Sequence, residues 1–321
     1  MKILVTGAAG FIGSHAALAL TGRGHHVLGV DSLNDYYDPA LKESRLARLS
    51  GQPLFAFEKL DIAEDAALGA LMTKYAPDRV LHLAAQAGVR YSIENPMAYA
   101  RSNLLGHLSV LEAARHTSSV RHLTYASSSS VYGERDDAPF RETDPVETPM
   151  SLYAATKRAD ELMSATYCRL YGLAQTGLRF FTVYGPWGRP DMAYWLFTKA
   201  ILAGEPIKVF NDGIMERDFT YVDDVIRTVV KIVEAGAETG THTLYNIGGS
   251  DPRPLKDFIA AIEKAVGRKA EKIMLPMQPG DVTRTSADVS ALARDFDYAA
   301  TTRIEDGVQA FVDWYKDYFK I

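Results

Sequence analysis

The sequence predicts an α/β protein with a doubly wound parallel sheet and a smaller C-terminal lobe. In the first half of the chain, short runs rich in β-branched residues alternate with helical patterns, which is typical of parallel strands joined by crossover helices. A run such as RVLHLAA (79–85) is apolar on both faces, as expected for a strand buried between two helix layers. A glycine pattern, GAAGFIG (7–13), directly follows the first of these runs.

The same patterns place the individual elements. Helices are expected over 11–24, 96–115 and 152–171. After residue 178 the rhythm changes to longer loops with short helices between them, which indicates a lobe of different build. The expected strands of the first half are KILVT (2–6), HVLGVD (26–31), LFAFEKLD (54–61), RVLHLAA (79–85) and VRHLTYAS (120–127).

Composition excludes several function classes. The 321 residues include 35 Lys and Arg against 40 Asp and Glu, and the formal charge of -5 is spread along the chain. This balance argues against nucleic acid or an anionic membrane as a partner. The one cysteine, Cys168, cannot form an internal disulfide, and no segment approaches the ~20 apolar residues of a membrane helix. We therefore expect a cytoplasmic protein.

The glycine pattern predicts a dinucleotide site. Gly7, Gly10 and Gly13 let the backbone approach a pyrophosphate at the start of a helix, where Phe11 and Ile12 follow, although a simple tight turn gives the same pattern. The next strand ends in Asp31, whose carboxylate suits two ribose hydroxyls and repels a 2′-phosphate. No arginine follows in residues 32–34, so NAD is expected rather than NADP, in a Rossmann-type domain over 1–177.

The end of the third strand offers a further cofactor contact. Asp61 and Ile62 are placed to flank the adenine by the same geometry. The alternative is that Asp61 caps the helix that follows.

Tyr153 and Lys157 predict the chemistry. At i and i+4 on a helix they project from one face, and the ammonium stabilises a phenolate, so Tyr153 suits a general base near neutrality. This spacing also arises by chance. Its weight comes from the upstream nucleotide signature and from the serine run 127–130 at a strand end, in which Ser128 is the expected partner of Tyr153.

These residues resemble the extended short-chain dehydrogenase/reductase family over nearly the whole chain. The strings 34–46, 84–96, 179–193, 215–225 and 277–282 are similar to UDP-glucuronate 4-epimerases. The resemblance implies that bound NAD oxidises the sugar at C4, that the keto-sugar rotates, and that the hydride returns to its other face. It also implies a homodimer built through the helices that begin at 96 and 152, and a lobe over 178–321 that mainly binds the nucleotide sugar, with segments around 215–250 returning to the first domain.

The resemblance also implies substrate contacts. Arg217 matches a position that meets a UDP phosphate, unless it pairs with Asp218 or Asp223, and Asp281 resembles the carboxylate that binds the uridine ribose. Gln278 stands where many relatives carry arginine, and Arg284 is a candidate substitute.

The sugar carboxylate needs its own binding group, because oxidation at C4 creates a β-keto acid that tends to lose carbon dioxide. Hydroxyls of Ser128, Ser129, Ser130 and Thr182 with the charge of Arg189 predict a cradle that prevents this loss, and Arg90 is a further candidate. Ser130 could equally serve local backbone bonds, and Arg189 could be a surface residue. Ser127 is expected to be structural.

Other functions stay open at this point. A UDP-glucuronate decarboxylase, a UDP-glucose 4-epimerase and, less so, a non-catalytic NAD-binding regulator share most of these features. No metal is expected, because adjacent His25 and His26 point to opposite faces of a strand.

Overall fold

The computed structural model describes residues 1–135, 137–277 and 282–321, and these form two compact units. The first unit comprises Met1–Val131, Val146–Arg179 and Ile226–Tyr245. The second unit comprises Tyr132–Pro145, Phe180–Val225 and Asn246–Ile321. Residues 132–145, which the sequence placed with the first domain, thus group with the second unit.

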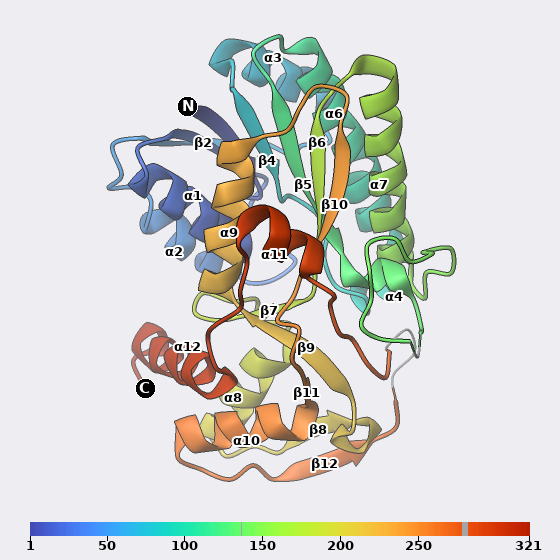
Figure 1. Cartoon of the computed structure of the whole chain (residues 1–321). Coiled ribbons are helices and arrows are strands. Elements are labelled where there is room, and N and C mark those ends of the chain that lie inside the picture. Colours follow the sequence, from blue (N-terminus) through green and yellow to red (C-terminus); the bar gives the residue numbers. More distant parts are fainter. Residues whose placement is uncertain (136, 278–281) are drawn as a thin grey trace. The chain divides into compact units, whose positions relative to one another are not determined.

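A seven-stranded sheet forms the centre of the first unit, in the order β10-β6-β5-β4-β1-β2-β3 (Figure 1). β1 pairs in parallel with β2 and β4, and the pairs β2–β3 and β4–β5 are also parallel. The order 3-2-1-4-5-6 is that of a Rossmann sheet, so the expected doubly wound fold is confirmed. The strands are β1 (Lys2–Thr6), β2 (His26–Asp31), β3 (Phe55–Lys59), β4 (Arg79–His82), β5 (His122–Ser128), β6 (Gln175–Phe180) and β10 (His242–Ile247).

The carboxyl ends of the central strands meet at one edge of this sheet. Thr6, the last residue of β1, is in register with Val30 of β2 and with His82 of β4. After β1 the chain continues to β2 on one side, and after β4 it continues to β5 on the opposite side. The carboxyl ends of β1 and β4 therefore form the switch point where ligands bind in such sheets. The side chains of these central strands belong to the hydrophobic core, and Leu4, for example, is fully buried.

Helices cover both faces of this sheet (Figure 1). α3, α6 and α7 pack side by side, and α1 packs on β1, β2 and α2. The helical segments are α1 (Phe11–Gly22), α2 (Pro39–Ala47), α3 (Asp65–Tyr75), α4 (Tyr91–Glu94), α5 (Pro96–Tyr99), η1 (Ala100–Leu105), α6 (Gly106–His116), η2 (Ser129–Tyr132), α7 (Leu152–Tyr171) and α9 (Val222–Ala235).

Of the two long helices that were predicted, the one over 152–171 is confirmed, whereas the one over 96–115 is interrupted. α7 has the bounds expected, because Ser151 caps its start by accepting from the Ala154 N–H at 3.1 Å and Gly172 ends it with φ of 70°. The helix expected over 96–115 is not one straight α-helix, since η1 inserts a π-helical turn between α5 and α6. Asn103 lies in that turn.

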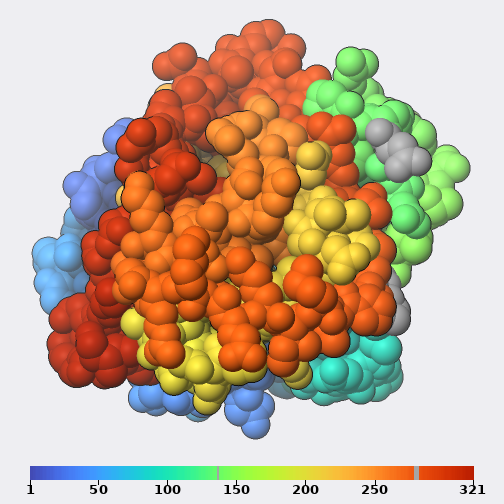
Figure 2. Space-filling model, turned by 90° about the horizontal axis from the view of Figure 1, so that it is seen from below, coloured from blue at the N-terminus to red at the C-terminus, as the bar shows by residue number. Residues whose placement is uncertain are grey.

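The second unit is built on two smaller sheets, β11-β9-β7 and β12-β8. Phe219 of β9 stacks on Phe258 of α10 with ring centroids 4.0 Å apart. Figure 2 shows the face of this unit on which α10 and β12 lie, in orange. Its elements are β7 (Thr182–Tyr184), α8 (Ala193–Ala203), β8 (Ile207–Phe210), η3 (Asn211–Gly213), β9 (Glu216–Tyr221), β11 (Pro252–Pro254), α10 (Leu255–Val266), β12 (Lys272–Leu275), α11 (Ser290–Phe296) and α12 (Ile304–Phe319).

Within the described ranges, none of the helices combines the length and the apolar character needed to cross a bilayer.

Candidate active site

The glycine loop between β1 and α1 leaves no room for side chains. Gly7 has φ of 72°, and a Cβ there would lie 2.7 Å from the Ala84 backbone nitrogen. A Cβ on Gly13 would lie 2.0 Å from the Gly7 carbonyl oxygen. Gly10 is the N-cap of α1 and supplies no side chain to its first N–H groups. The loop is therefore a backbone cradle at a helix start, which fits the pyrophosphate of a dinucleotide.

Asp31 is held against this loop. Its Oδ2 accepts from the Ala9 N–H at 3.1 Å and its Oδ1 from the Leu33 N–H at 2.9 Å. Each oxygen keeps a lone pair, and the side chain stays partly exposed. A carboxylate fixed in this way fits the paired hydroxyls of an adenosine ribose.

Two cations near Asp31 were missed by the sequence reasoning, which searched for arginine only next to that residue. Lys42 of α2 donates to the Asn34 carbonyl oxygen at 2.7 Å. Arg45, fully buried, donates to the Ala9 carbonyl oxygen at 3.1 Å. Burial lowers the pKa of Lys42, against the attraction of Asp31. The string 34–46 contains both residues, but only the fold brings α2 back onto the glycine loop.

Asp61 follows β3 and is engaged on both oxygens. Oδ1 accepts from the Ala63 N–H at 2.9 Å, and Oδ2 accepts from Arg101 Nε at 3.0 Å. α3 begins at Asp65 with Glu64 as its N-cap, so the alternative that Asp61 caps this helix is wrong. Ile62 beside it is buried. The contact of Asp61 and Ile62 with an adenine stays a prediction.

Tyr153 and Lys157 lie one turn apart on α7, and the lysine is anchored to the neighbouring strand. Lys157 is buried, and its Nζ donates to the Ala126 carbonyl oxygen of β5 at 2.9 Å. β5 ends at Ser128, so this bond joins the helix that carries Tyr153 to the strand that carries Ser128. Tyr153 is partly exposed, with its ring 6.1 Å from that of buried Tyr99.

The serine run divides by position. Ser127 Oγ donates to Glu161 Oε1 at 2.7 Å, so its hydroxyl has a structural partner on α7 rather than in the local backbone. Ser128 is buried, and its Oγ accepts from the Ser130 N–H at 3.2 Å. The chain then turns through η2, which leaves Ser129 and Ser130 partly exposed.

In the second unit, Arg189 has a carboxylate partner within its own loop. Its Nε lies 3.0 Å from Asp191 Oδ1, and its Nη2 contacts Asp191 Oδ2, which makes a two-pronged pair. The Arg189 backbone N–H donates to the Tyr194 hydroxyl at 3.1 Å. Thr182, partly exposed, begins β7. Sequence reasoning missed Asp191.

Arg217, on β9, reaches backbone carbonyl groups. Its Nη2 donates to the Val282 oxygen at 2.6 Å and its Nη1 to the Glu216 oxygen at 3.0 Å. Arg284 pairs with Glu216, Nε to Oε2 at 2.9 Å. In the first unit, Arg90 lies exposed before α4.

Two predicted positions, Gln278 and Asp281, lie outside the described residues.

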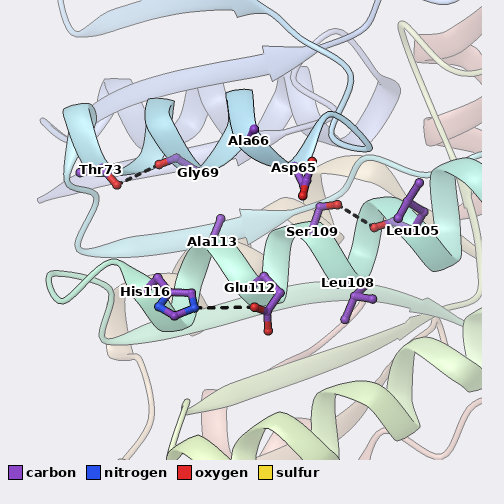
Figure 3. A pocket seen from close by; sticks show the side chains of 10 residues that line it. All are labelled: Asp65, Ala66, Gly69, Thr73, Leu105, Leu108, Ser109, Glu112, Ala113 and His116. Atoms are coloured by element: carbon purple, nitrogen blue, oxygen red, sulfur yellow. Dashed lines mark hydrogen bonds and ion pairs between the residues drawn. The ribbon is translucent and has the colours of Figure 1, made fainter.

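A separate hollow lies between α3 and α6 (Figure 3). Its lining includes Asp65 and Thr73 of α3 and Ser109, Glu112 and Ala113 of α6. Of the predicted site residues that the structure describes, none lines it. In the part of the chain that the structure describes, no three His, Cys, Asp or Glu side chains are grouped to hold a metal ion.

The Rossmann sheet, its glycine loop and the pair Tyr153–Lys157 are the features of an NAD-dependent enzyme class. The chain belongs to the NAD dependent epimerase/dehydratase family, whose model matches residues 3–248. The family expected from the sequence is thus confirmed.

Three relatives make the relationship specific. UDP-glucuronate 4-epimerase 4 of Arabidopsis thaliana is 44% identical over 333 residues, which cover 99% of this chain and 76% of that protein. The crystal structure of UDP-glucuronic acid 4-epimerase from Bacillus cereus in complex with UDP-glucuronic acid and NAD has a TM-score of 0.93 at 36% identity, covering 99% of this chain and 100% of that one. UDP-glucose 4-epimerase from Thermotoga maritima with UDP-glucose has a TM-score of 0.90 at 29% identity, with the same coverage.

Proposed function

We propose that this protein is a UDP-glucuronate 4-epimerase, which interconverts UDP-glucuronate and UDP-galacturonate without decarboxylation. One observation of the structure supports it above others: buried Lys157, one turn from Tyr153, is bonded to the strand that ends in Ser128. The full-length similarity to the plant and Bacillus cereus UDP-glucuronate epimerases supports the choice of sugar.

The residues that would hold NAD are those of the glycine loop with Asp31, Asp61 and Ile62, together with Tyr153 and Lys157. The loop fits the pyrophosphate, because Gly7 and Gly13 turn in positions where a Cβ would clash with the backbone, and the N-terminal N–H groups of α1 have no side-chain cap. When bound, NAD would supply the group that accepts hydride from C4 of the sugar and donates it back. Because the cofactor is regenerated in each cycle, it should remain bound.

Tyr153 would take the proton of the 4-hydroxyl as the C4 hydrogen leaves, and would give it back when the carbon is reduced from its other face. Ser128 would share the hydrogen bond of that hydroxyl. Lys157 has one N–H beyond its contacts with Ala126 and Asp160, which would bind the nicotinamide ribose.

The sugar carboxylate would be held by Ser129, Ser130, Thr182 and Arg189. If the carboxylate is held in the plane of the sugar ring, the C–C bond that joins it to the ring is poorly aligned with the π system of the C4 ketone. Hydrogen bonds to the carboxylate also disfavour its conversion to neutral carbon dioxide. No acidic residue stands in the run 127–130. Arg189 is bonded to Asp191, so the substrate carboxylate would exchange with that side chain.

The nucleotide would be bound by Arg217 and by Asp281, with Arg90 near the sugar. A guanidinium already oriented by backbone carbonyls is suited to a diphosphate. UDP-glucuronate decarboxylase and UDP-glucose 4-epimerase are the competing activities, and a silent NAD-binding regulator is a third.

The protein is proposed to act as a cytoplasmic homodimer. Exposed apolar side chains line the outer faces of the helices from 96 and 152, namely Met97, Leu105, Leu108, Leu162 and Leu170. A second copy that paired these helices as a four-helix bundle would cover them.

The test is to incubate the protein with UDP-glucuronate and resolve the products. UDP-galacturonate should appear with the pyridine nucleotide remaining oxidised at the end of turnover. A UDP-pentose as the product would instead assign a decarboxylase, and faster turnover of UDP-glucose would assign the neutral-sugar epimerase.

A further inference from the structure

Lys157 and Asp160 form a buried ion pair on α7. Lys157 Nζ lies 3.0 Å from Asp160 Oδ2, and the two side chains are only 4% and 1% exposed. The Ala126 carbonyl oxygen accepts a second bond from the same nitrogen at 2.9 Å. An ammonium has three N–H groups, so these two contacts fix the direction of the third.

The other oxygen of Asp160 has an unusual environment. Among the residues that the structure describes, Oδ1 has no hydrogen-bond partner, although it is buried. Burial raises the pKa of Asp160 to about 6, against the attraction of Lys157. A buried carboxylate that is only half satisfied costs stability, and such groups are concentrated at functional sites.

Several other titratable groups surround the pair of Lys157 and Asp160. The His107 imidazole on α6 lies against the Asp160 backbone, with His82 of β4 at 5.2 Å ring to ring. Burial lowers the pKa of His82 to about 3 and that of His107 well below its usual value, so both are neutral near pH 7. The other titratable and charged groups around the pair are Tyr125 of β5, Arg179 of β6, His242 of β10, and Arg158 and Glu161 of α7.

These neighbours do not duplicate Asp160. Burial raises the pKa of Tyr125 well above its usual value, so its phenol is neutral. Glu161 is compensated by Arg179, with Nε to Oε1 at 2.8 Å, and by Arg158. The charge that offsets Lys157 directly is therefore that of Asp160.

We propose that Asp160 is a positioning residue of the catalytic pair: it aims the Lys157 ammonium and offsets its charge, and so sets the pH range in which Tyr153 acts as a base. This inference rests on the proposed roles of Tyr153 and Lys157. The positive charge of Lys157 favours the Tyr153 phenolate, and the negative charge of Asp160 opposes that effect.

Without the negative charge of Asp160, Tyr153 loses its proton at lower pH. The acid limb of the pH profile, where turnover rises as the base ionises, therefore moves to lower pH. In the wild type, protonation of Asp160 below about pH 6 has the same consequence, so the two profiles should converge there. Residues 153 and 160 lie about two turns apart on α7, so the acid limb is expected to shift by about half a pH unit to one pH unit.

The experiment compares Asp160→Asn with Asp160→Ala, with Ser164→Ala as the control. Asn keeps an oxygen for Lys157 but removes the charge, whereas Ala removes both. Ser164 is a buried polar residue on the same helix whose hydroxyl contacts His107, not Lys157. Turnover of UDP-glucuronate is measured against pH for each protein.

Asp160→Asn should shift the acid limb while its plateau rate stays within about threefold of the wild type. Asp160→Ala should show the same shift with a plateau at least about tenfold lower. Ser164→Ala should leave the profile in place. A profile of Asp160→Asn that superimposes on the wild type above pH 6 overturns the proposal.

A second readout does not depend on turnover. The ultraviolet absorbance of the phenolate, taken as the difference from Tyr153→Phe in the same background, reports ionisation of Tyr153 directly. It should move to lower pH in Asp160→Asn, and an unchanged titration contradicts the proposal. If wild-type protein fails to convert UDP-glucuronate, the proposed function fails, and this titration still decides the role of Asp160.

Discussion

Ser127 donates a hydrogen bond from Oγ to Glu161 Oε1 at 2.7 Å, and through it the end of β5 is bonded to α7. Arg179 of β6 completes the arrangement, with Nε and Nη2 at 2.8 and 2.9 Å from the two carboxylate oxygens. Strand and helix carry the two parts of the proposed catalytic group, Ser128 and Tyr153. The buried ion pair of Glu161 and Arg179 therefore holds in place the strand and the helix that carry Ser128 and Tyr153.

Replacing Glu161 by Gln should destabilise the first unit. The change removes the carboxylate charge that Glu161 presents to the buried Arg179 guanidinium, and we expect the free energy of unfolding to fall by about 3 kcal/mol. Urea unfolding followed by circular dichroism measures this. Arg158→Gln is the control, because Arg158 is a partly exposed partner of the same carboxylate and should cost below about 1 kcal/mol. Equal effects of the two changes would refute the role given to Arg179.

Tyr153→Phe should abolish most turnover while the protein stays folded. Loss of a general base typically lowers the rate by ~10²–10⁴-fold, and bound NAD should remain, since the phenol is only one of its contacts. Turnover of UDP-glucuronate and the NAD content of the purified protein are the two measurements. Tyr171→Phe, an exposed tyrosine at the other end of α7, is the control. Undiminished turnover in Tyr153→Phe would disprove the base assignment.

Arg189→Ala should separate acid from neutral sugars. Loss of the guanidinium should raise KM for UDP-glucuronate by about tenfold or more and affect UDP-glucose far less, because only the acid carries a carboxylate. Steady-state kinetics with both substrates test this.

The opposite change is informative for the same pair. Asp191→Asn removes the carboxylate that competes for Arg189, so KM for UDP-glucuronate should fall. Arg303→Ala, which breaks an exposed pair with Asp306, is the control for surface charge. A KM that rises equally for both sugars in Arg189→Ala would remove Arg189 from carboxylate binding.

Stability should fall as the pH drops below about 6.5. Burial lowers the pKa of His82 to about 3 and that of His15 and His122 to about 4. The unfolded chain binds protons at these histidines below pH 6.5 while the folded chain does not, so each contributes stability that is present above pH 6.5 and lost as the pH falls toward its folded value. The expected slope is about 1.4 kcal/mol per pH unit for each group.

A variant checks this assignment. His122→Gln should flatten the dependence of the unfolding free energy on pH between 4 and 6.5. His116→Gln, at an exposed position, should leave the slope unchanged. Identical slopes in wild type and His122→Gln would show that another group is responsible.

A charge placed on the exposed apolar face should dissociate the proposed dimer. Leu162→Asp and Leu170→Asp lie two turns apart on α7, where both side chains are exposed. Sedimentation velocity should show a dimer for the wild type and a monomer for the double variant, because two carboxylates would be desolvated in the bundle. Leu196→Asp, an exposed leucine on α8, is the control. A wild-type protein that sediments as a monomer would contradict the proposal.

Local signals explain what the sequence predicted. The bounds of α7 follow from a capping serine and a left-handed glycine, both of which act within one turn. The Rossmann sheet follows from alternating apolar runs and the glycine loop. These features depend on residues close together in the chain, so a single sequence was sufficient to find them.

The features that the sequence did not predict depend on tertiary contacts or on irregular backbone. Lys42 and Arg45 reach Asn34 and Ala9 only because α2 folds back onto the glycine loop. The π turn around Asn103 accompanies side-chain bonds to Gln86 and Thr156, which no helical period reports. Asp191 pairs with Arg189 within one loop, where no periodicity indicates which side chains face each other.

Asp160 is an intermediate case. It stands three residues after Lys157, a spacing that the sequence displays, and three residues on a helix are neighbours. What the spacing could not indicate is that both side chains are buried and that one carboxylate oxygen has no partner among the described residues.

The most direct test of the central claim uses UDP-glucuronate that carries deuterium at C4. If the sugar is oxidised and reduced at that carbon by enzyme-held NAD, with its carboxylate retained, the product is UDP-galacturonate that keeps the deuterium at C4. Loss of the deuterium to solvent, or a UDP-pentose in place of the hexuronate, would contradict the account.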